Sequence, residues 1–516
     1  MSNYIKIYAN MKKFIKQYGI IISSLFLMIG FFSCQDLEEN PAGMLGSETF
    51  YTTTADLDAA VMATYKALAD DPWGGYASRN IWNPLMAGDD MGSANGGNAF
   101  DRFNATDLNT SMHWRRSYIT IRQASDVINN AGKVVGGSEA YINKCVAEAR
   151  FLRAWNYFWL VRLYGAIPMV ISTEINYDLP KSSVAEIYAL IVEDLTFAVA
   201  NLPKSRAEAE SDSKRGPGQP SIWSAKALLS QVYITMAGWP INDASKYALA
   251  AKEALDVINS NEYRLLDDFD DLWWDENDNN DEIVWSIQFC NFPDCGVWQR
   301  CTFIGLNVMA GEDAGGWTDF PAELGFYNRF PEGYRKERTF QTVFEQWRDG
   351  ELTKVTPFEE SAQKRPHYKK FRNGYVYGAP DFNGDSDHMG GRDLPYLRFA
   401  EVLLLYAEAQ CMADGGPNTL AYQCINRVRE RAQKGVADDL TPGLDKIAFR
   451  NAVIDERGWE FAQEFCRWFD LVRTEKVEET VARKVPEIDY LPLNPVTKER
   501  YIFPIPYTEK LLNPNL

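Results

Sequence analysis

The sequence predicts a mainly α-helical fold, in which paired helices stack as repeats and are interrupted by long irregular loops with a few short strands. Apolar residues recur at spacings of three and four through most of the chain. The segment around Ala149 carries two apolar stripes, so it would pack on both sides, as helices do in stacked repeats. Between the periodic segments lie stretches rich in Gly, Asn, Asp and Pro, which are typical of loops.

The periodic segments form two blocks. A helical repeat core is predicted over about 56–262 and 395–475, with an irregular insertion over about 263–394. Ser183 and Glu186 have the spacing of a capping box, which would begin one helix of the first block. The predicted helices lie at residues 56–70, 113–132, 139–164, 182–201, 221–237, 243–260, 396–413, 418–433 and 444–475.

The helix predicted at 396–413 has little polar surface, which places it at the centre of the core. Glu401 and Glu408 are its main polar residues and lie two helical turns apart. We interpret them as ion-pair partners of core arginines such as Arg398 or Arg427.

The insertion differs in pattern from the helical blocks. Residues 281–289 alternate apolar and polar side chains, which indicates a strand. The remainder is rich in Gly, Asp, Asn, Pro and aromatic residues, as are residues 71–110. Irregular segments of this length in a folded domain are usually functional, so we expect a ligand-facing half here.

The N-terminal region has the features of a bacterial lipoprotein signal. Lys12, Lys13 and Lys16 form a positive region, an apolar stretch follows, and Ser33 precedes Cys34. We predict a signal peptide at residues 1–33, a single domain at residues 34–516, and acylation of Cys34 as a membrane anchor. The alternative is a plain signal peptide with an incidental cysteine. No other segment has the roughly 18 apolar residues that a membrane helix needs.

The charge balance narrows the class of ligand. The chain holds 71 acidic and 53 basic residues, a formal charge of −18, and the predicted signal contains lysines but no acid. Such an acidic protein is unsuited to nucleic acid and to direct docking on anionic lipid. A neutral ligand, a cation or a partner with basic loops fits better.

The cysteines fall into two groups once Cys34 is set aside. One group lies in apolar helical patterns, where buried free thiols are expected. The other group clusters in one irregular stretch, where a disulfide is possible but the spacing does not establish one. With three histidines in the chain, a Cys/His zinc site is not expected. The first group is Cys145, Cys411, Cys424 and Cys466, and the second is Cys290, Cys295 and Cys301.

Aromatic residues in the irregular segments point to a carbohydrate ligand. Sugar rings stack on aromatic faces, while Asn, Asp and Arg bridge adjacent hydroxyls. The alternative for each aromatic residue is local packing, which we assign to Trp273 and Trp274. The predicted ligand residues are Trp73, Tyr76, Arg79, Asn95, Asn98 and Phe100 in one group, and Trp298, Arg300, Trp317 and Phe320 in another, with Tyr375 and Tyr377 joining it.

Catalysis is not expected. No zinc-protease helix, nucleophile elbow or phosphate-binding glycine loop is present. A glycosidase needs two carboxylates at a defined separation. With 71 acidic residues in the chain, some pair can always be proposed, so such a pair does not indicate catalysis. We therefore predict a non-enzyme without a cofactor.

One short motif has some features of a calcium-binding loop. Asp381, Asn383, Asp385 and Asp387 alternate oxygen ligands as a calcium loop does. The glycine stands at the fourth position rather than the sixth and no acid stands at the twelfth, so the motif is not an EF-hand. A solvated turn is the favoured interpretation.

Several strings, in this order, resemble the SusD/RagB family of outer-membrane nutrient-binding lipoproteins. An acidic, proline-ended start follows Cys34, and the end Phe503–Pro506 is also family-like. The helices between them resemble the first long helix, the repeat helix and the C-terminal core of that family. These strings are WRRSYITIRQASDVINN (114–130), AEARFLRAWNYFWLVRLYGAIP (147–168), DEIVWSIQ (281–288), RFAEVLLLYAEA (398–409), INRVRERA (425–432) and DERGWEFAQEFCRWFDLVR (455–473).

The resemblance implies four tetratricopeptide-like units supporting an irregular ligand face. It also implies a partner, a SusC-like TonB-dependent transporter, on which the protein sits as a hinged lid at the outer face of the outer membrane and delivers oligosaccharides. Gly458 and Ala462–Gln463 depart from the family pattern, away from the expected ligand loops. Two alternatives stay open: a glycan-cleaving lipoprotein, and a repeat scaffold or peptide binder without a sugar ligand. The sequence does not name the glycan.

Overall fold

The computed structural model describes residues 11–13, 50–69, 83–93, 98–172, 174, 176–212, 214–289, 320–348, 350–370, 393–436, 439–464 and 466–516. The chain divides into two units, Met1–Phe50 and Tyr51–Leu516. In the first unit the described residues Met11–Lys13 form an exposed helical turn, while Cys34 and the predicted cleavage point lie outside the described residues. The helices formed by the described residues are all too short or too polar to cross a membrane.

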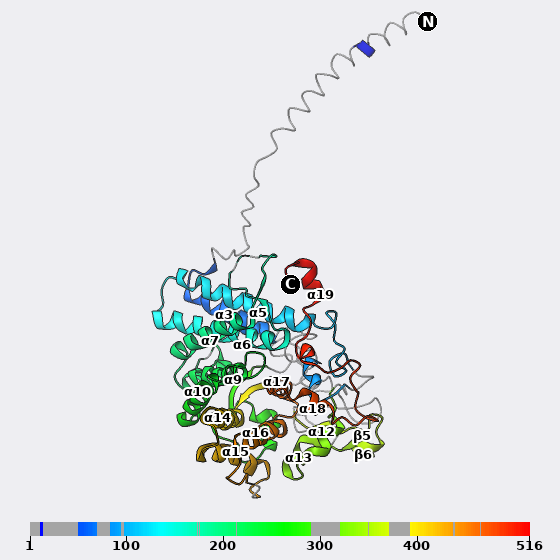
Figure 1. The fold of residues 1–516 in the computed structure, drawn as a ribbon. Helices are drawn as coiled ribbons and strands as arrows, with labels where there is room; N and C mark the ends of the chain where they lie inside the picture. Colours follow the sequence, from blue (N-terminus) through cyan, green and yellow to red (C-terminus); the bar gives the residue numbers. More distant parts are fainter. Residues whose placement is uncertain are drawn as a thin grey trace, which may run out of the picture. The chain divides into compact units, whose positions relative to one another are not determined.

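The helices of the second unit stack in chain order (Figure 1). Helix α5 packs on α6, α6 on α7, α7 on α9, α9 on α10, and α10 on α14, which also contacts α15 and α16. Successive antiparallel partners of this kind are the arrangement of helical repeats. The longer helices are α3 (Thr54–Ala69), α5 (Ser111–Asn130), α6 (Glu139–Tyr164), α7 (Val184–Asn201), α9 (Ile222–Met236), α10 (Lys246–Ser260), α14 (Phe399–Asp414), α15 (Thr419–Ala432) and α16 (Lys446–Glu460). The shorter ones are α8 (Arg206–Glu210), α12 (Leu324–Arg329), α13 (Tyr334–Thr339), α17 (Arg467–Arg473), α18 (Val477–Val481) and α19 (Tyr507–Leu512).

The helix predictions are confirmed to within a few residues, with one exception. The predicted helix 444–475 is two helices, α16 and α17, separated by a turn. In that turn Gln463 adopts a positive φ of 60°, and its N–H donates to Asp90 Oδ2 at 2.9 Å. The capping box is confirmed, because Ser183 Oγ accepts from the N–H of Glu186 at 3.3 Å and Glu186 Oε2 accepts from the N–H of Ser183 at 2.8 Å.

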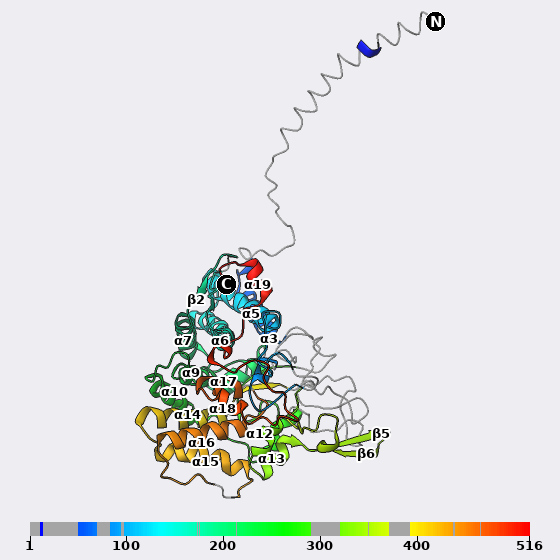
Figure 2. The same cartoon turned by 45° about the vertical axis from the view of Figure 1, so that its right-hand side comes forward.

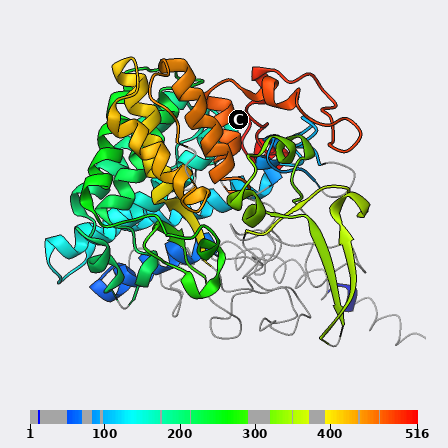
Figure 3. The same ribbon diagram turned by 90° about the horizontal axis from the view of Figure 1, so that it is seen from below.

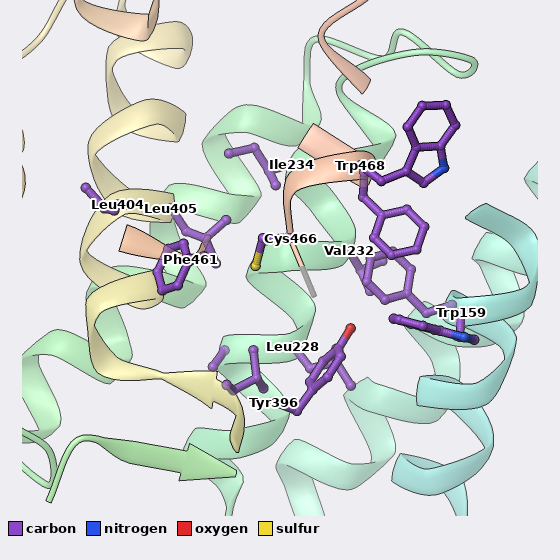
Figure 4. Close-up of a cluster of buried hydrophobic side chains, with 14 of the residues drawn as sticks. Trp159, Leu228, Val232, Ile234, Tyr396, Leu404, Leu405, Phe461, Cys466 and Trp468 are labelled. Atoms are coloured by element: carbon purple, nitrogen blue, oxygen red, sulfur yellow. The ribbon is translucent and has the colours of Figure 1, made fainter. Parts of the chain in front are cut away.

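The core is centred on α6, from which Trp155 and Trp159 are fully buried. The Trp155 ring lies 5.2 Å from the ring of Tyr396, and Trp159 lies 5.2 Å from Phe469. Figure 4 shows Trp159 and Tyr396 close together, with Trp468 in the same cluster of buried side chains; the Trp159 and Tyr396 rings lie 6.3 Å apart. Phe158, from the other apolar stripe, lies 6.2 Å from the ring of Tyr188 in α7, so both stripes predicted for this helix are used in packing.

The described residues form four two-stranded antiparallel sheets. Strand β3 confirms the strand predicted at 281–289, and it pairs with β8 with Ile287 opposite Leu394. The expectation that the rest of 263–394 is irregular is wrong for α12, α13 and the strands β4 to β7. Strands β4 and β7 pair across 28 residues, with Phe340 opposite Tyr368, whereas β5 and β6 form a local hairpin. The β5–β6 hairpin projects from this region (Figures 2 and 3). The strands are β1 (Ile167–Pro168), β2 (Lys181–Ser182), β3 (Ile283–Ile287), β4 (Phe340–Gln341), β5 (Val343–Arg348), β6 (Glu351–Pro357), β7 (His367–Tyr368) and β8 (Leu394–Arg398).

The acids of α14 are ion-paired in the core, but with other partners than predicted. Glu401 accepts from Arg457 Nη2 at 3.1 Å, and Glu408 accepts from Arg473 Nη1 at 2.6 Å. Arg398 instead binds a different set of buried acids: Glu282, which directly precedes β3, Glu460 at the end of α16, and Glu464 in the turn after α16. Helix periodicity identifies which acids are buried, but the choice of arginine depends on how distant helices pack.

The four cysteines predicted to be free are free and buried: Cys145, Cys411, Cys424 and Cys466. Trp273 is buried, as its assignment to packing requires. Cys290, Cys295 and Cys301 lie outside the described residues.

Candidate functional site

Most residues predicted to contact a ligand lie outside the described part of the chain. They are Trp73, Tyr76, Arg79, Asn95, Trp298, Arg300, Trp317, Tyr375 and Tyr377, together with the calcium candidates Asp381, Asn383, Asp385 and Asp387. Of the predicted ligand residues, the structure describes Asn98, Phe100 and Phe320. It also describes the residues that flank the segments with the other predicted residues, which are 70–82, 94–97, 290–319 and 371–392.

Phe100 and Phe320 belong to the hydrophobic core rather than to a ligand surface. Each has 4% of its surface exposed, and the Phe100 ring packs edge-on against Phe503 at 4.9 Å. A buried ring offers no face to a sugar, so both assignments are corrected to packing. Their positions beside glycine-rich loops resemble those of exposed platforms, and only the tertiary contacts separate the two cases.

Asn98 shapes a turn at the end of segment 94–97. Its side-chain Oδ1 accepts from the N–H of Phe100 at 2.7 Å, and its Nδ2 donates to Asn83 Oδ1 at 3.3 Å. Asp101 accepts from the N–H of Asn98 and from the N–H of Ser93, both at 2.9 Å. One carboxylate therefore holds both ends of segment 94–97, and Asn83 places the end of segment 70–82 beside them.

Three distant stretches of chain lie side by side where these segments begin or end. Residues 90–93, 320–323 and 365–368 form what we term the anchor frame. Gly92 N–H donates to Pro321 O at 3.0 Å, and Ala322 N–H donates to Pro366 O at 2.9 Å.

Buried side chains complete the anchor frame. Arg365 Nη2 donates to the carbonyl of Ser93, and Tyr368 Oη donates to the carbonyl of Asp90 at 2.5 Å. Segment 94–97 follows Ser93 directly, and segment 371–392 begins three residues after Tyr368. Segment 290–319 ends directly before Phe320, the first residue of stretch 320–323. Three of the four segments therefore adjoin the anchor frame.

The other ends of the two long segments meet at the β3–β8 sheet. Phe289, the last described residue before segment 290–319, donates its N–H to Asp393 Oδ1 at 2.7 Å. Asp393 is the first described residue after segment 371–392, and Asn279 Nδ2 donates to its Oδ2 at 2.6 Å. Glu464 Oε1 accepts from Lys370 at 2.8 Å and from Arg398 at 2.9 Å, which links the start of 371–392 to strand β8.

The anchor frame holds a carboxyl group with a strongly altered pKa. Glu323 has 1% of its surface exposed and accepts from Lys484 Nζ at 2.9 Å. Burial raises the pKa of this carboxyl to about 8 and Asp489 adds to the rise, while Lys484 opposes it. Burial outweighs the single ion pair, and Glu323 Oε2 has no hydrogen-bond partner among the described residues.

Burial also raises the pKa of two other carboxyls beside the segments and lowers the pKa of a neighbouring histidine. Burial, and then Asp278, raises the pKa of Asp393 to about 7. Burial also raises the pKa of Asp101. Burial lowers the pKa of His367 to about 3, with a further contribution from Arg365. Raised carboxyl pKa values also occur in catalytic acids. Here Asp101 and Asp393 accept backbone N–H groups and hold loop ends.

No group of three or more His, Cys, Asp and Glu side chains within the described ranges is placed to hold a metal ion. The anchoring residues Asp101, Glu323, Arg365 and Asp393 were not identified from the sequence. The sequence feature that could have identified such a residue is a charged side chain at the border between a loop and an apolar strand. Asp393, directly before Leu394, is an example.

Two family profiles match the chain. The first, described as "SusD family", matches residues 325–516, and the second, described as "Starch-binding associating with outer membrane", matches residues 40–234. The matched regions include the repeat helices and the C-terminal core that the sequence strings indicated.

Full-length relatives agree with the profiles. SusD-like protein P2 of Formosa agariphila is 30% identical, and the alignment covers 96% of this chain and 98% of that protein. A SusD superfamily protein from Parabacteroides distasonis has a solved structure with a TM-score of 0.75 and 25% identity, covering 92% of this chain and 99% of that one. A protein titled surface glycan-binding protein A from Bacteroides fluxus shares the fold, with a TM-score of 0.73 and 22% identity over 89% of this chain and 97% of that one. The chain therefore belongs to the SusD family.

Proposed function

We propose that the chain is a lipid-anchored cell-surface protein that binds oligosaccharides and delivers them to a SusC-like TonB-dependent transporter of the outer membrane. One observation carries the proposal. In a chain of the SusD family, three of the four segments with the predicted ligand residues adjoin the anchor frame, two of these also adjoin the β3–β8 sheet, and the fourth, 70–82, is linked to the frame through the hydrogen bond between Asn83 and Asn98.

This arrangement supports binding because it brings the ends of sequence-distant segments together. Loops on a rigid scaffold can present aromatic faces and hydrogen-bonding groups to one ligand. The profile description names starch binding and the outer membrane, and the Bacteroides fluxus protein with the same fold is titled as glycan-binding. The proposal also includes acylation of Cys34 and a position of the protein on the outer face of the membrane. The lipoprotein signal predicted at residues 1–33 supports the lipid anchor.

The first test is isothermal titration of the chain lacking residues 1–34 against a panel of neutral oligosaccharides of defined linkage. The folded unit begins at Tyr51, so this truncation leaves it whole. We expect binding to one linkage class that is lost in Trp298→Ala and in Trp317→Ala. Retention of full affinity in both variants would place the site elsewhere. If no oligosaccharide of the panel binds, a peptide ligand or a scaffold function would be favoured.

The enzyme alternative is tested with the same material. Incubation with the polysaccharide that binds should release no shorter product, and accumulation of reducing ends would establish hydrolysis. Partner and anchor are tested on the full chain: metabolic labelling with palmitate should be lost in Cys34→Ala, and detergent extracts should yield a complex with a TonB-dependent transporter.

A further inference from the structure

A cavity lies between α5, the described residues between 168 and 179, and the C-terminal helix α19. Helices α5 and α19 lie at the other end of the helical stack from the β5–β6 hairpin (Figures 1 and 2). The volume of the cavity is about 320 Å³, within the range of small-molecule sites. Trp114 and Tyr118 form part of its floor, and both are held in place. Tyr118 Oη donates to Pro168 O at 2.8 Å, and the Trp114 ring packs on Tyr118 at 4.9 Å.

Two arginines line the cavity from one face of α5. Arg115 and Arg122 are both exposed and lie seven residues apart, which is two helical turns or about 10 Å. Neither makes a hydrogen bond or an ion pair within the described residues. The Asp126 carboxylate, four residues after Arg122, acts on it electrostatically. Two guanidinium groups that line one cavity and have no acidic hydrogen-bond partner among the described residues can bind an anionic ligand, although the chain as a whole is acidic.

An exposed aromatic ring completes the wall. Tyr177 has 61% of its surface exposed, lines the cavity and makes no hydrogen bond within the described residues. Asn176 and Glu509 also line it, and their side chains can donate to and accept from hydroxyl groups. A ring to stack on, hydroxyl partners and two anion-binding groups therefore occur in one cavity.

We infer that this cavity is a second binding site, for an acidic oligosaccharide that carries uronate or sulfate groups. This inference rests on the proposed function as a glycan-binding protein. Tyr177 stacks on the apolar face of one sugar ring, and Arg115 and Arg122 bind two anionic groups separated by about the length of a disaccharide unit. Glu509 and Asn176 accept and donate hydrogen bonds at the hydroxyls, and the apolar side chains of Ile119, Val170, Leu179, Leu512 and Leu516 line the rest of the cavity.

The test compares acidic and neutral probes on four forms of the chain lacking residues 1–34: the unaltered chain and three variants. The acidic probes are an oligogalacturonate and a chondroitin sulfate oligosaccharide, and the neutral probes are the oligosaccharides of the panel above. The variants are Arg115→Gln/Arg122→Gln, which keeps bulk and polarity, and Trp298→Ala/Trp317→Ala. Tyr177→Ala is a third variant, whose exposed position leaves the fold intact.

We expect at least one acidic probe to bind the unaltered chain, with affinity that falls as salt is raised. For the acidic probe, the arginine variant should lose at least tenfold in affinity and Tyr177→Ala should lose several-fold. Trp298→Ala/Trp317→Ala should bind the acidic probe as tightly as the unaltered chain does. Hydrogen exchange should show protection of residues 113–122 and 507–516 when the acidic probe is added. Absence of acidic binding, or binding that the arginine variant retains and the tryptophan variant loses, would overturn the inference.

The two proposals fail separately. Loss of neutral binding in the tryptophan variant upholds the proposed function whether or not the cavity beside α5 binds an acidic probe. Acidic binding that depends on Arg115 and Arg122 upholds the second site even if no neutral sugar binds.

Discussion

Gly92 stands against the carboxylate of Glu323, so closely that a Cβ atom at position 92 would overlap Glu323 Oε1 and lie 2.8 Å from Arg365 Nη1. The backbone of Gly92 has no positive φ, so the requirement for glycine here is steric. Stretch 90–93 can lie alongside stretch 320–323 because position 92 carries no side chain. The anchor frame depends on this close approach.

Gly92→Ala should therefore weaken oligosaccharide binding several-fold and lower the free energy of unfolding by about 1–3 kcal/mol, because Glu323 and Arg365 must move. Titration calorimetry and urea denaturation measure the two effects. Gly132→Ala is the matched control, since a Cβ at that position meets nothing within 4 Å. Equal affinities for the two alanine variants would show that the frame does not position the binding segments.

Glu323→Gln should change how stability depends on pH. The pKa of this carboxyl is about 8 in the folded chain against an ordinary 4.5, so the folded state holds the proton more tightly and stability falls as pH rises from about 4.5 to about 8. Glutamine does not titrate and removes this part of the slope. Relative to the unaltered chain, the variant should gain about 1–4 kcal/mol between pH 5 and pH 9.

Urea denaturation across this pH range checks the expected gain. Glu332→Gln, whose side chain is 86% exposed, should follow the unaltered chain at every pH. A Glu323→Gln curve parallel to both would contradict the raised pKa.

Arg398→Ala should destabilise the fold strongly. Arg398 donates to Glu282 at 2.6 Å and to Glu464 at 2.9 Å, and all three side chains are buried, so the change leaves acids without their counter-charge. We expect a loss of about 3–5 kcal/mol in the free energy of unfolding. Arg264→Ala breaks an exposed pair with Asp281 at 2.8 Å and should cost less than about 1 kcal/mol. Similar losses in the two variants would show that burial does not set the cost.

Removal of calcium should leave the protein unchanged. The motif from Asp381 to Asp387 lacks the spacing of an EF-hand, and the sequence favours a solvated turn. The melting temperature and the oligosaccharide affinity should be the same in EDTA and in millimolar calcium. A higher melting temperature in calcium that is lost in Asp385→Asn would establish a metal site instead.

The sequence determined the helical architecture of this protein because helix periodicity is local information. Helices 139–164 and 182–201 were predicted nearly to the residue, and the capping pair Ser183 and Glu186 marks the start of the second of these helices. The order of helices and family strings along the chain was sufficient to indicate the SusD family, which the relatives confirm.

Only the tertiary structure decided which residues meet. Glu401 pairs with Arg457, and Arg398 with Glu282, because helix packing and strand pairing bring together residues far apart in the chain. The same holds for Phe100 and Phe320, which share loop-like surroundings with the predicted platforms and are buried. The shared anchoring of the four segments also depends on hydrogen bonds between distant stretches. Such contacts leave no periodic signal in the sequence, since each partner is chosen by the fold as a whole.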